Sequence, residues 1–430
     1  MIESAKIINP KRTSLNSGKA SWYPYYAGYS DHFVTGILNS VNLNRDSVVL
    51  DPWNGSGTTT TIANNRGFQA VGYDLNPVMI IASKACLLNK NDYTSIEPIC
   101  KQIIGRANSD KITIKEDEPL NLWLYPKSAI YIRKLERAIQ RVLINDTRYS
   151  EIADAGFVNH ISSIASFFYV ALFRSLNGFL ERFRPTNPTW IKLPKSDTER
   201  ILICRELINT SFLNEVKLMI ASVMSENITL PSRSVSNISL ASSCDMPISP
   251  ASVDLIISSP PYCTRIDYAV ATMPELTLLG YHYSSSFDTL RRKLIGASTI
   301  SKMQVKPLDQ WGDTCLNFLD AVFHHDSKAS KSYYYKSHLQ YFDSIHNSIL
   351  EIERALKIGG GCILVVQDSH YKDVYNNLPM IFREMAEQVG LKHVKTEHFD
   401  SARNMAKRNP GVKKYRSHAT ATESVLCLKK

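Results

Sequence analysis

The sequence predicts an α/β fold: a doubly wound, mostly parallel sheet with an antiparallel C-terminal strand and a helical insertion. Two short apolar runs near the N-terminus, residues 48–50 and 69–73, each end at an aspartate and precede a helix start. A third apolar run, residues 253–257, leads into a polar residue and two prolines. Buried strands that alternate with helices are typical of parallel sheets, whose ligands bind beyond the carboxyl ends of the strands.

The first strand leads into a glycine turn. Residues 51–59 read DPWNGSGTT, in which Gly55 and Gly57 permit a tight turn before a helix that begins near Thr58. The third glycine of a dinucleotide fingerprint is replaced by Thr60, and no Gly-Lys-Ser/Thr of a Walker loop follows. The turn therefore lacks the features that bind a pyrophosphate.

The second strand ends at Asp74. An acidic residue at that edge suits the hydroxyl groups of a ribose in a nucleoside-binding sheet. Asn76 and Pro77 open the next helix, since asparagine caps helices and proline fits their first position. A glycine turn and a ribose carboxylate without phosphate-binding features fit a nucleoside that carries no pyrophosphate. S-adenosylmethionine is the candidate.

The third strand ends in the tetrapeptide Ser259, Pro260, Pro261 and Tyr262. The prolines remove backbone donors, so the carbonyls around them stay free to accept hydrogen bonds. The tyrosine offers a flat face for stacking. These groups suit an exocyclic amine on a planar ring, although a plain turn after a core strand explains the tetrapeptide alone equally well. The glycine turn upstream favours the first interpretation.

These segments resemble the motifs of the amino-methylating DNA methyltransferases, which modify cytosine N4 or adenine N6. Residues 51–59 look like their motif I, whose usual form is D-P-F-x-G-S-G-T-T, and residues 72–77 resemble motif II. Residues 259–262 match catalytic motif IV in its S-P-P-Y form. Residues 22–27 are similar to motif X, which closes over the methionine end of the cofactor.

The resemblance covers roughly residues 20–90 and 235–370 and implies a class I S-adenosylmethionine-dependent methyltransferase core. It makes the tetrapeptide catalytic and implies a set of cofactor-binding residues. These are Tyr25, Asp51, Trp53, Gly55, Gly57, Thr58, Asp74 and Asn76.

Two departures from the family's pattern stand out. Trp53 replaces the phenylalanine of motif I, which keeps an aromatic ring but adds bulk near the cofactor. The acidic residue of motif III is missing. Ser242 stands at its place and Asp245 follows three residues later, so the adenine contact is assigned to neither.

The chain divides into three expected parts. Residues 1–90 hold motif X and the first half of the core. Residues 91–230 form a helical insertion, which is a candidate target-recognition region or a structural cap. Residues 231–430 hold the second half of the core with motif IV and a basic C-terminal region. A final pair of strands, about residues 393–399 and 423–428, is expected to finish the sheet antiparallel.

Two helices are predicted within the insertion. Residues 127–143 place apolar side chains at helical spacing and leave the basic residues mostly toward solvent. These basic residues are Arg133, Lys134, Arg137 and Arg141. Residues 157–180 are the longest apolar segment, but charged and polar interruptions make a buried helix the expectation rather than a membrane span.

A second block, residues 287–335, combines basic and aromatic side chains. It contains Arg291, Arg292 and Lys293, with three consecutive tyrosines at its end. Such a combination suits contact with a nucleic-acid backbone and stacking on bases. A surface loop explains the block nearly as well.

Composition fits a soluble intracellular enzyme, and the resemblance implies the cytoplasm of a prokaryotic cell or its phage. The net charge of +10 favours a polyanionic partner such as double-stranded DNA. The eight cysteines are scattered without a C-x-x-C pair, which argues against a zinc site and a disulfide framework. The amino terminus is polar, so no signal peptide is expected.

The expected reaction is direct methyl transfer from S-adenosylmethionine to the exocyclic amine of a base flipped out of DNA. Cytosine N4 is favoured over adenine N6 because the serine side chain at position 259 reaches less far than aspartate or asparagine. A restriction-modification system is implied, with a cognate endonuclease encoded nearby as a candidate partner.

Three alternatives remain. A C5-cytosine enzyme attacks with a cysteine thiolate, but that family places its cysteine directly after the prolines, where Tyr262 stands, so Cys263 is read as a bystander. An RNA methyltransferase more often begins the motif with aspartate or asparagine. A catalytically inactive nucleic-acid-binding protein is the third, and the intact motifs I and IV argue against it.

Overall fold

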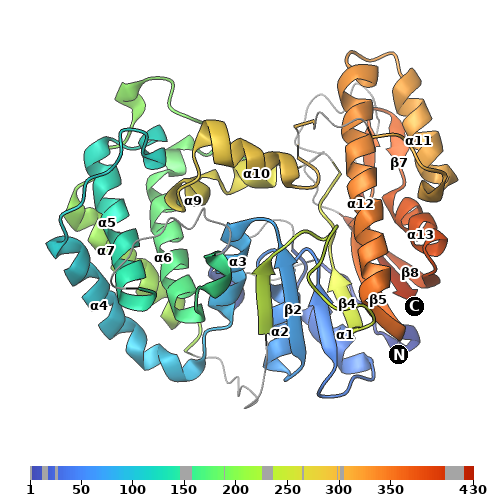
Figure 1. Cartoon of the computed structure of the whole chain (residues 1–430), viewed down its shortest axis with the longest axis horizontal. Coiled ribbons are helices and arrows are strands. Elements are labelled where there is room, and N and C mark those ends of the chain that lie inside the picture. The colour runs from blue at the N-terminus through green and yellow to red at the C-terminus, as the bar shows by residue number, and fades with distance from the viewer. Residues whose placement is uncertain are drawn as a thin grey trace.

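The structure is a computed structural model of the chain. It describes residues 2–11, 18–24, 28–145, 157–187, 189–224, 236–263, 266–297, 299–300, 305–401 and 421–430. A seven-stranded sheet with the order β3-β2-β1-β4-β5-β9-β8 forms its centre (Figure 1).

Five strands of the sheet run parallel and adjoin an antiparallel edge. The parallel strands are β1 (Val48–Asp51), β2 (Gln69–Asp74), β3 (Ser236–Leu240), β4 (Val253–Ser258) and β5 (Leu356–Gln367). The strand β9 (Ala421–Lys429) is antiparallel to both β5 and β8 (Lys392–Ser401). The predicted fold class is confirmed, including the final antiparallel pair, and the architecture is consistent with a class I methyltransferase fold.

Strand order reverses between β1 and β4, which are neighbours although the chain builds β2 and β3 between them. Open α/β sheets bind ligands in the crevice at such a switch point. The glycine turn follows β1 and the tetrapeptide follows β4, so the topology brings both to this crevice.

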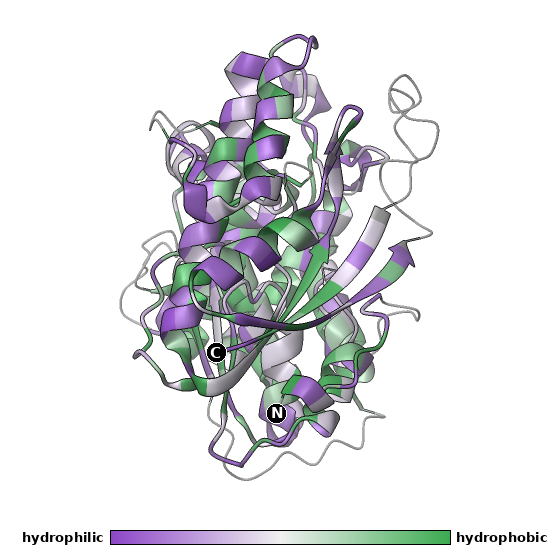
Figure 2. Cartoon of the chain, turned by 90° about the vertical axis from the view of Figure 1, so that its right-hand side faces the viewer, coloured by the Kyte–Doolittle hydropathy of each residue, from purple (hydrophilic) through white to green (hydrophobic). Residues whose placement is uncertain are grey.

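Period-two alternation divides the core between the two faces of the sheet. Val49 and Ile257 pack with α1 (Asp31–Ser40) on one face. Leu50 and Ile256 pack on the other face with the helices that follow β4. In Figure 2 the inner strands are largely coloured as hydrophobic, whereas hydrophilic residues colour much of the surrounding helices. The strands were therefore recognisable from their apolar runs.

Helices of the insertion pack on the helix that follows β2. The helices that follow β1 and β2 are α2 (Thr58–Asn65) and α3 (Pro77–Cys86). The insertion contributes α4 (Tyr93–Ser109), α5 (Pro126–Leu143), α6 (Ser163–Phe179) and α7 (Arg205–Ala221). They form the group beside α3 in Figure 1, and all ten residues of α3 are buried between sheet and insertion.

The two helices predicted in the insertion are α5 and α6, and α6 is buried along most of its length as expected. No helix in the described ranges is both long enough and apolar enough to cross a bilayer.

A chain of short helices crosses above the sheet from the insertion to a second helical group (Figure 1). The crossing helices are α8 (Tyr268–Ala271), α9 (Met273–Leu278) and α10 (Asp288–Lys293). The second group holds α11 (Asp313–His324), α12 (Tyr335–Ala355), α13 (Leu378–Gln388) and a hairpin of β6 (Ser369–Tyr371) and β7 (Val374–Asn376).

Short helical turns connect these elements. They are η1 (Ile2–Ser4), η2 (Gly18–Ser21), η3 (Lys90–Asp92), η4 (Pro119–Leu122), η5 (Val158–His160), η6 (Glu181–Phe183), η7 (Asp197–Glu199), η8 (Tyr283–Phe287), η9 (Asp309–Trp311) and η10 (Ser330–Tyr334).

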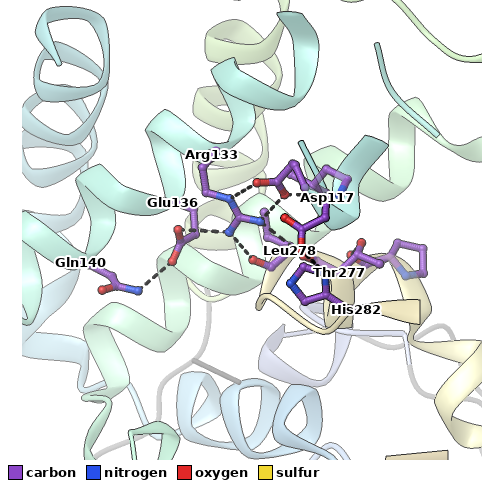
Figure 3. A network of polar contacts seen from close by, with 10 residues as sticks. Asp117, Arg133, Glu136, Gln140, Thr277, Leu278 and His282 are labelled. Carbon is purple, nitrogen blue, oxygen red and sulfur yellow. Dashed lines mark hydrogen bonds and ion pairs between the residues drawn. The ribbon is translucent and has the colours of Figure 1, made fainter. Parts of the chain in front are cut away.

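Arg133 corrects one expectation from the sequence, because it is buried rather than turned toward solvent. Its Nη2 lies 2.6 Å from Glu118 Oε1, and its Nη1 lies 3.3 Å from Glu136 Oε2. The same Nη1 donates to the Leu278 carbonyl at the end of α9, at 2.7 Å. Figure 3 shows this network, in which the insertion holds α9 in place. Charge compensation by Glu136 on the same helix and by Glu118 before it explains a burial that helical spacing did not indicate.

Replacing Arg133 by leucine should therefore destabilise the fold. The variant leaves two buried carboxylates without their cation, which costs about 3–5 kcal/mol when one partner of a buried pair is removed. Lys134→Met, at the next and only half-buried position, should change stability by about 0.5 kcal/mol or less. Urea unfolding followed by circular dichroism measures both, and equal stabilities of the two variants would contradict the assigned role of Arg133.

Candidate ligand-binding and catalytic site

A cavity of about 590 Å³ opens at the carboxyl edge of β1, β2 and β4. Of the predicted cofactor-binding and catalytic residues, five line its wall: Trp53, Asp74, Asn76, Ser259 and Pro261. Pro260 and Tyr262 of the tetrapeptide are not among the lining residues. The cavity thus joins the predicted cofactor-binding edge to the predicted catalytic tetrapeptide. Its volume is in the range of pockets that bind small molecules and cofactors, about 300–1,000 Å³.

Asp74 ends β2 with both carboxylate oxygens oriented by backbone donors. The Gly55 N–H donates to Oδ2 at 3.0 Å, and the Asn76 N–H donates to Oδ1 at 2.8 Å. Each carboxylate oxygen has a second lone pair that can accept from a ligand hydroxyl. Burial raises the pKa of Asp74 to about 6 although these backbone donors lower it, and the nearby Asp51 charge adds to the rise. The group is therefore ionised near neutral pH and begins to take up a proton just below it.

The glycine turn is packed closely against its neighbours. Gly57 is left-handed at φ +85°, and a Cβ there would lie 2.6 Å from the Ser83 Cβ on α3. A Cβ on Gly72 in β2 would lie 2.6 Å from the Asn54 Cγ. Asn54 is itself held because its Oδ1 accepts from the Thr60 hydroxyl at 2.9 Å. Tight packing of turn, strand and helix thus requires both glycines.

Asp51 does not line this cavity, but it lines a small one of about 20 Å³ together with Trp53 and Ser259. It is only 2% exposed, and its Oδ1 accepts from the Ser258 hydroxyl at 2.5 Å. Its Oδ2 accepts from the Tyr29 hydroxyl at 3.1 Å. Burial raises the pKa of Asp51 to about 6, against the lowering effect of these donors. The structure shows Asp51 bound to groups of the protein, and its contact with a cofactor stays a prediction.

The other predicted cofactor residues lie around the cavity or outside the described residues. Gly57 and Thr58 line a smaller neighbouring cavity of about 70 Å³. Tyr23, from the segment similar to motif X, lines both cavities. Gly55 contributes its backbone N–H to Asp74. Tyr25 falls outside the described residues.

Hydrogen bonds fix Ser259 and Pro261 of the tetrapeptide. The Ser259 hydroxyl donates to the Val365 carbonyl on β5 at 3.1 Å. The Pro261 carbonyl accepts from the Tyr341 hydroxyl at 3.0 Å. Among the described residues, no group donates to the Pro260 carbonyl. The donated proton fixes the serine orientation and leaves lone pairs of its oxygen free to accept.

Tyr262, at the end of the tetrapeptide, is half-buried. Its backbone N–H donates to the Tyr268 hydroxyl at 3.2 Å. Gly296 packs against its carbonyl, since a Cβ at that position would lie 2.6 Å from the oxygen. Burial raises the pKa of Tyr268, so this hydroxyl stays neutral. The first residue of α8 and the loop after α10 thus hold the backbone of Tyr262.

Cys263 follows the tetrapeptide but lies in the hydrophobic core. Its side chain is 1% exposed and belongs to the cluster beneath α12. The Asn376 amide donates weakly to its sulfur at 3.8 Å. A nucleophile must reach its substrate, and the Cys263 side chain is buried in this core, whereas Tyr262 is half-buried.

Several cavity residues were not singled out from the sequence. The insertion supplies Arg174 and Asn177 from α6 and Glu215 from α7. The Arg174 Nε lies 2.6 Å from Glu215 Oε2, and its Nη1 donates to the Trp22 carbonyl at 3.1 Å. The sequence signal was that Arg174 and Asn177 interrupt an otherwise apolar segment. The insertion therefore forms part of the cavity wall.

The segment after β3 places a different serine at the cavity than the sequence alignment indicated. Ser243 lines the wall, whereas Ser242 and Asp245 do not. Asp245 is exposed, and its backbone N–H bonds to the Ser242 carbonyl in a tight turn. The structure thus gives no carboxylate at the expected motif III position within its described residues.

Of the three consecutive basic residues 291–293 in the second block, Arg291 forms an ion pair within the protein. Its Nη2 lies 2.7 Å from Asp267 Oδ2, and Asp267 also caps α8 by accepting from the Val270 N–H. Arg292 and Lys293 are exposed. Only the latter two are therefore placed to meet a polyanion.

Comparison with known proteins gives relatives at low identity, and no family model matches the chain. The chain is 23% identical over 344 residues to the type II methyltransferase M.BsoBI of Geobacillus stearothermophilus, an alignment that spans 72% of this chain and 63% of that protein. It is 21% identical over 418 residues to the type II methyltransferase M.AvaI of a Nostoc species, spanning 89% of this chain and 82% of that protein.

A shorter match links the chain to the type II methyltransferase M.MwoI of Methanothermobacter wolfeii. It is 25% identical over 126 residues and spans 28% of this chain and 19% of that protein. The chain thus covers less than two thirds of M.BsoBI and M.MwoI. Together with the fold, these similarities support a methyltransferase family.

Proposed function

We propose that this protein transfers a methyl group from S-adenosylmethionine to the exocyclic amine of a base in DNA. The observation that carries the proposal is the single cavity that joins Asp74 at the end of β2 to Ser259 at the end of β4. A nucleoside cofactor and a target base need to meet at such a place. The type II methyltransferase names of the relatives also support it.

The cofactor would lie along the carboxyl edge of β2 and β1. Asp74 would accept from the ribose hydroxyls, with Trp53 and Asn76 beside it in the wall. S-adenosylmethionine supplies a methyl group on a sulfonium, which is a strong electrophile. The task left to the protein is to position an amine in line with that methyl group.

The target amine would lie at Ser259 and Pro260. An exocyclic amine delocalises its lone pair into the ring and is a poor nucleophile. Acceptors on both of its hydrogens favour a pyramidal nitrogen whose lone pair points at the methyl group. The Ser259 oxygen and the Pro260 carbonyl supply two such acceptors, because neither lone-pair set is fully used within the described protein.

In the transfer, the carbon–sulfur bond of the sulfonium breaks as the carbon–nitrogen bond forms. The sulfur keeps the electron pair and becomes a neutral thioether. The methylated amine then loses a proton toward its acceptors and solvent. Tyr262 would stack on the base, which must leave the duplex to reach the cavity. No covalent enzyme intermediate is required, in agreement with the burial of Cys263.

Double-stranded DNA is the proposed substrate. The chain carries a net charge of +10, which attracts polyanions. The insertion, residues 91–230, is proposed to recognise the target because it forms one side of the cavity through Arg174 and Asn177. The proposed partner is a cognate restriction endonuclease, and methylation would protect DNA from cleavage by it.

Within this proposal the methylated atom is cytosine N4, since the short Ser259 side chain suits a smaller ring. The purified protein should incorporate labelled methyl groups into duplex DNA, and nucleoside digestion followed by mass spectrometry should give N4-methylcytosine. N6-methyladenine as the sole product would overturn the choice of base. Methylation of total RNA but not of DNA would show that the substrate is RNA. Methylation of neither would contradict the proposed methyltransferase activity.

Asp74→Asn should weaken binding of S-adenosylhomocysteine, the stable product of the cofactor. Losing charge-assisted hydrogen bonds worth about 1.5–3 kcal/mol corresponds to about tenfold to a hundredfold in affinity. Calorimetric titration at pH 7.5 of the folded variant provides the test, and unchanged affinity would exclude Asp74 from the site.

Binding should also weaken as pH falls. The Asp74 carboxylate accepts only when ionised, and its pKa is raised to about 6. Wild-type affinity should therefore be constant above pH 7 and fall between pH 6.5 and 5.5, within about one unit of that pKa. Asp74→Asn should flatten this dependence, and a dependence in the variant as steep as that of the wild type would exclude Asp74 as its source.

Tyr262→Ala should lose most activity while keeping cofactor affinity. Base stacking is worth about 1–3 kcal/mol, so the rate at limiting DNA should fall about fivefold to more than a hundredfold. Cys263→Ser, at the adjacent buried position, should remain active. Steady-state methylation assays of both variants test direct transfer. A folded but inactive Cys263→Ser variant, together with an active Tyr262→Ala variant, would contradict it.

A further inference from the structure

Glu275 is a buried carboxylate in the cavity wall that the reaction described above does not use. It lies on α9 and is 1% exposed. Its Oε1 accepts from the Tyr23 hydroxyl at 2.9 Å and from the Asn177 amide at 2.7 Å. Its Oε2 has no hydrogen-bond partner among the described residues. Such an oxygen is costly to bury, and a donor from a ligand would satisfy it.

The orientation of this carboxylate is fixed by its neighbours. The Asn177 Oδ1 accepts from the Arg184 Nη2 at 2.6 Å, which directs the Asn177 amide nitrogen to Glu275. Tyr23 approaches from the segment that is similar to motif X. Because Oε1 is engaged by two donors from different elements, Oε2 is the atom left for a ligand.

The helix that carries Glu275 is also held at both ends. At its start, the Thr272 hydroxyl accepts from the Asn76 amide at 2.9 Å. At its end, Arg133 donates to the Leu278 carbonyl, as Figure 3 shows. A carboxylate that a rigid helix holds at a fixed position in the cavity wall is preorganised for binding.

The contacts of Glu275 place it on the cofactor side of the cavity. Tyr23 also lines the small cavity at Gly57 of the glycine turn. Asn76, which bonds Thr272, follows Asp74 at the ribose edge. No hydrogen bond joins Glu275 to the tetrapeptide among the described residues, so the target amine is the less favoured ligand.

We propose that Glu275 is a cofactor-binding residue whose carboxylate accepts a hydrogen bond from an amino group of S-adenosylmethionine. The inference rests on the proposed function. The cofactor carries two such groups, the ammonium of its amino-acid end and the exocyclic amine of adenine. Both offer N–H donors to an anionic acceptor, and a charge-assisted bond is the stronger kind.

The neighbouring charges of the wall support this assignment. Arg174 is paired with Glu215 at 2.6 Å, and Arg184 is bonded to Asn177. Neither guanidinium forms an ion pair with Glu275 in the described structure. A cationic or N–H donor from a ligand is therefore the group that this carboxylate can receive.

Glu275→Gln tests the proposal with little change of shape. The glutamine oxygen can still accept from Tyr23 and Asn177, while its amide nitrogen replaces the unpartnered oxygen by a donor. Affinity for S-adenosylhomocysteine should fall at least tenfold in calorimetric titration. Glu387→Gln, an exposed change of the same charge on α13, should bind like the wild type.

Titration with 5′-methylthioadenosine distinguishes the two amino groups, because this nucleoside lacks the amino-acid end. If its affinity for Glu275→Gln is unchanged, the ammonium is the partner, and if its affinity falls in parallel, the adenine amine is. Both results support the proposal. A folded Glu275→Gln that binds both ligands normally, or that loses affinity for DNA alone, overturns it.

A ligand series on the wild-type protein gives a test that needs no variant. S-adenosylhomocysteine is compared with one analogue lacking the amino-acid amine and one lacking the adenine amine. One of the two should bind at least tenfold more weakly, and equal binding of all three overturns the proposal. If wild-type protein binds none of them, the proposed function fails instead, so the two failures are distinguishable.

Discussion

The site depends on one buried carboxylate, Asp51, which joins the end of β1 to the end of β4. The Ser258 hydroxyl donates to it at 2.5 Å, immediately before the tetrapeptide, and the Trp53 N–H donates to the same oxygen from the glycine turn at 3.2 Å. The Tyr29 hydroxyl completes the set. Burying this charge is unfavourable, as its raised pKa indicates, and the donors offset part of the cost. The glycine turn and the tetrapeptide consequently occupy fixed positions relative to each other.

The insertion supplies the part of the cavity wall that the edge of the sheet does not. Arg174 holds the Trp22 carbonyl, Asn177 bonds Glu275, and Arg133 holds the end of α9. These contacts join residues that are 98 to 152 positions apart in the sequence. The helices of the insertion are therefore part of the cavity wall, and a substitution within them should change the affinity for the ligand. Target recognition and cofactor binding would then share one rigid frame.

Much of the sheet and of the site edge could be predicted from the sequence. Apolar runs that end in Asp51, Asp74 and Ser259 identify strands whose carboxyl ends converge, so local pattern and topology suffice. Glu275 and Arg133 could not be found in this way. Each is held in part by a group far away in the chain, the Tyr23 hydroxyl at Glu275 and the Leu278 carbonyl at Arg133. An isolated charged residue on a helix is usually exposed. Register and long-range packing, rather than local pattern, decide which charges enter the core.

The central claim is that one cavity holds the cofactor beside the tetrapeptide. A crystal structure of the protein soaked with S-adenosylhomocysteine tests it most directly. We expect density for the ligand in the cavity, with its ribose hydroxyls on Asp74 and its sulfur directed toward Ser259 and Pro260. Density for the ligand elsewhere, or in the cavity with the ribose away from Asp74 and the sulfur turned from the tetrapeptide, would contradict the account.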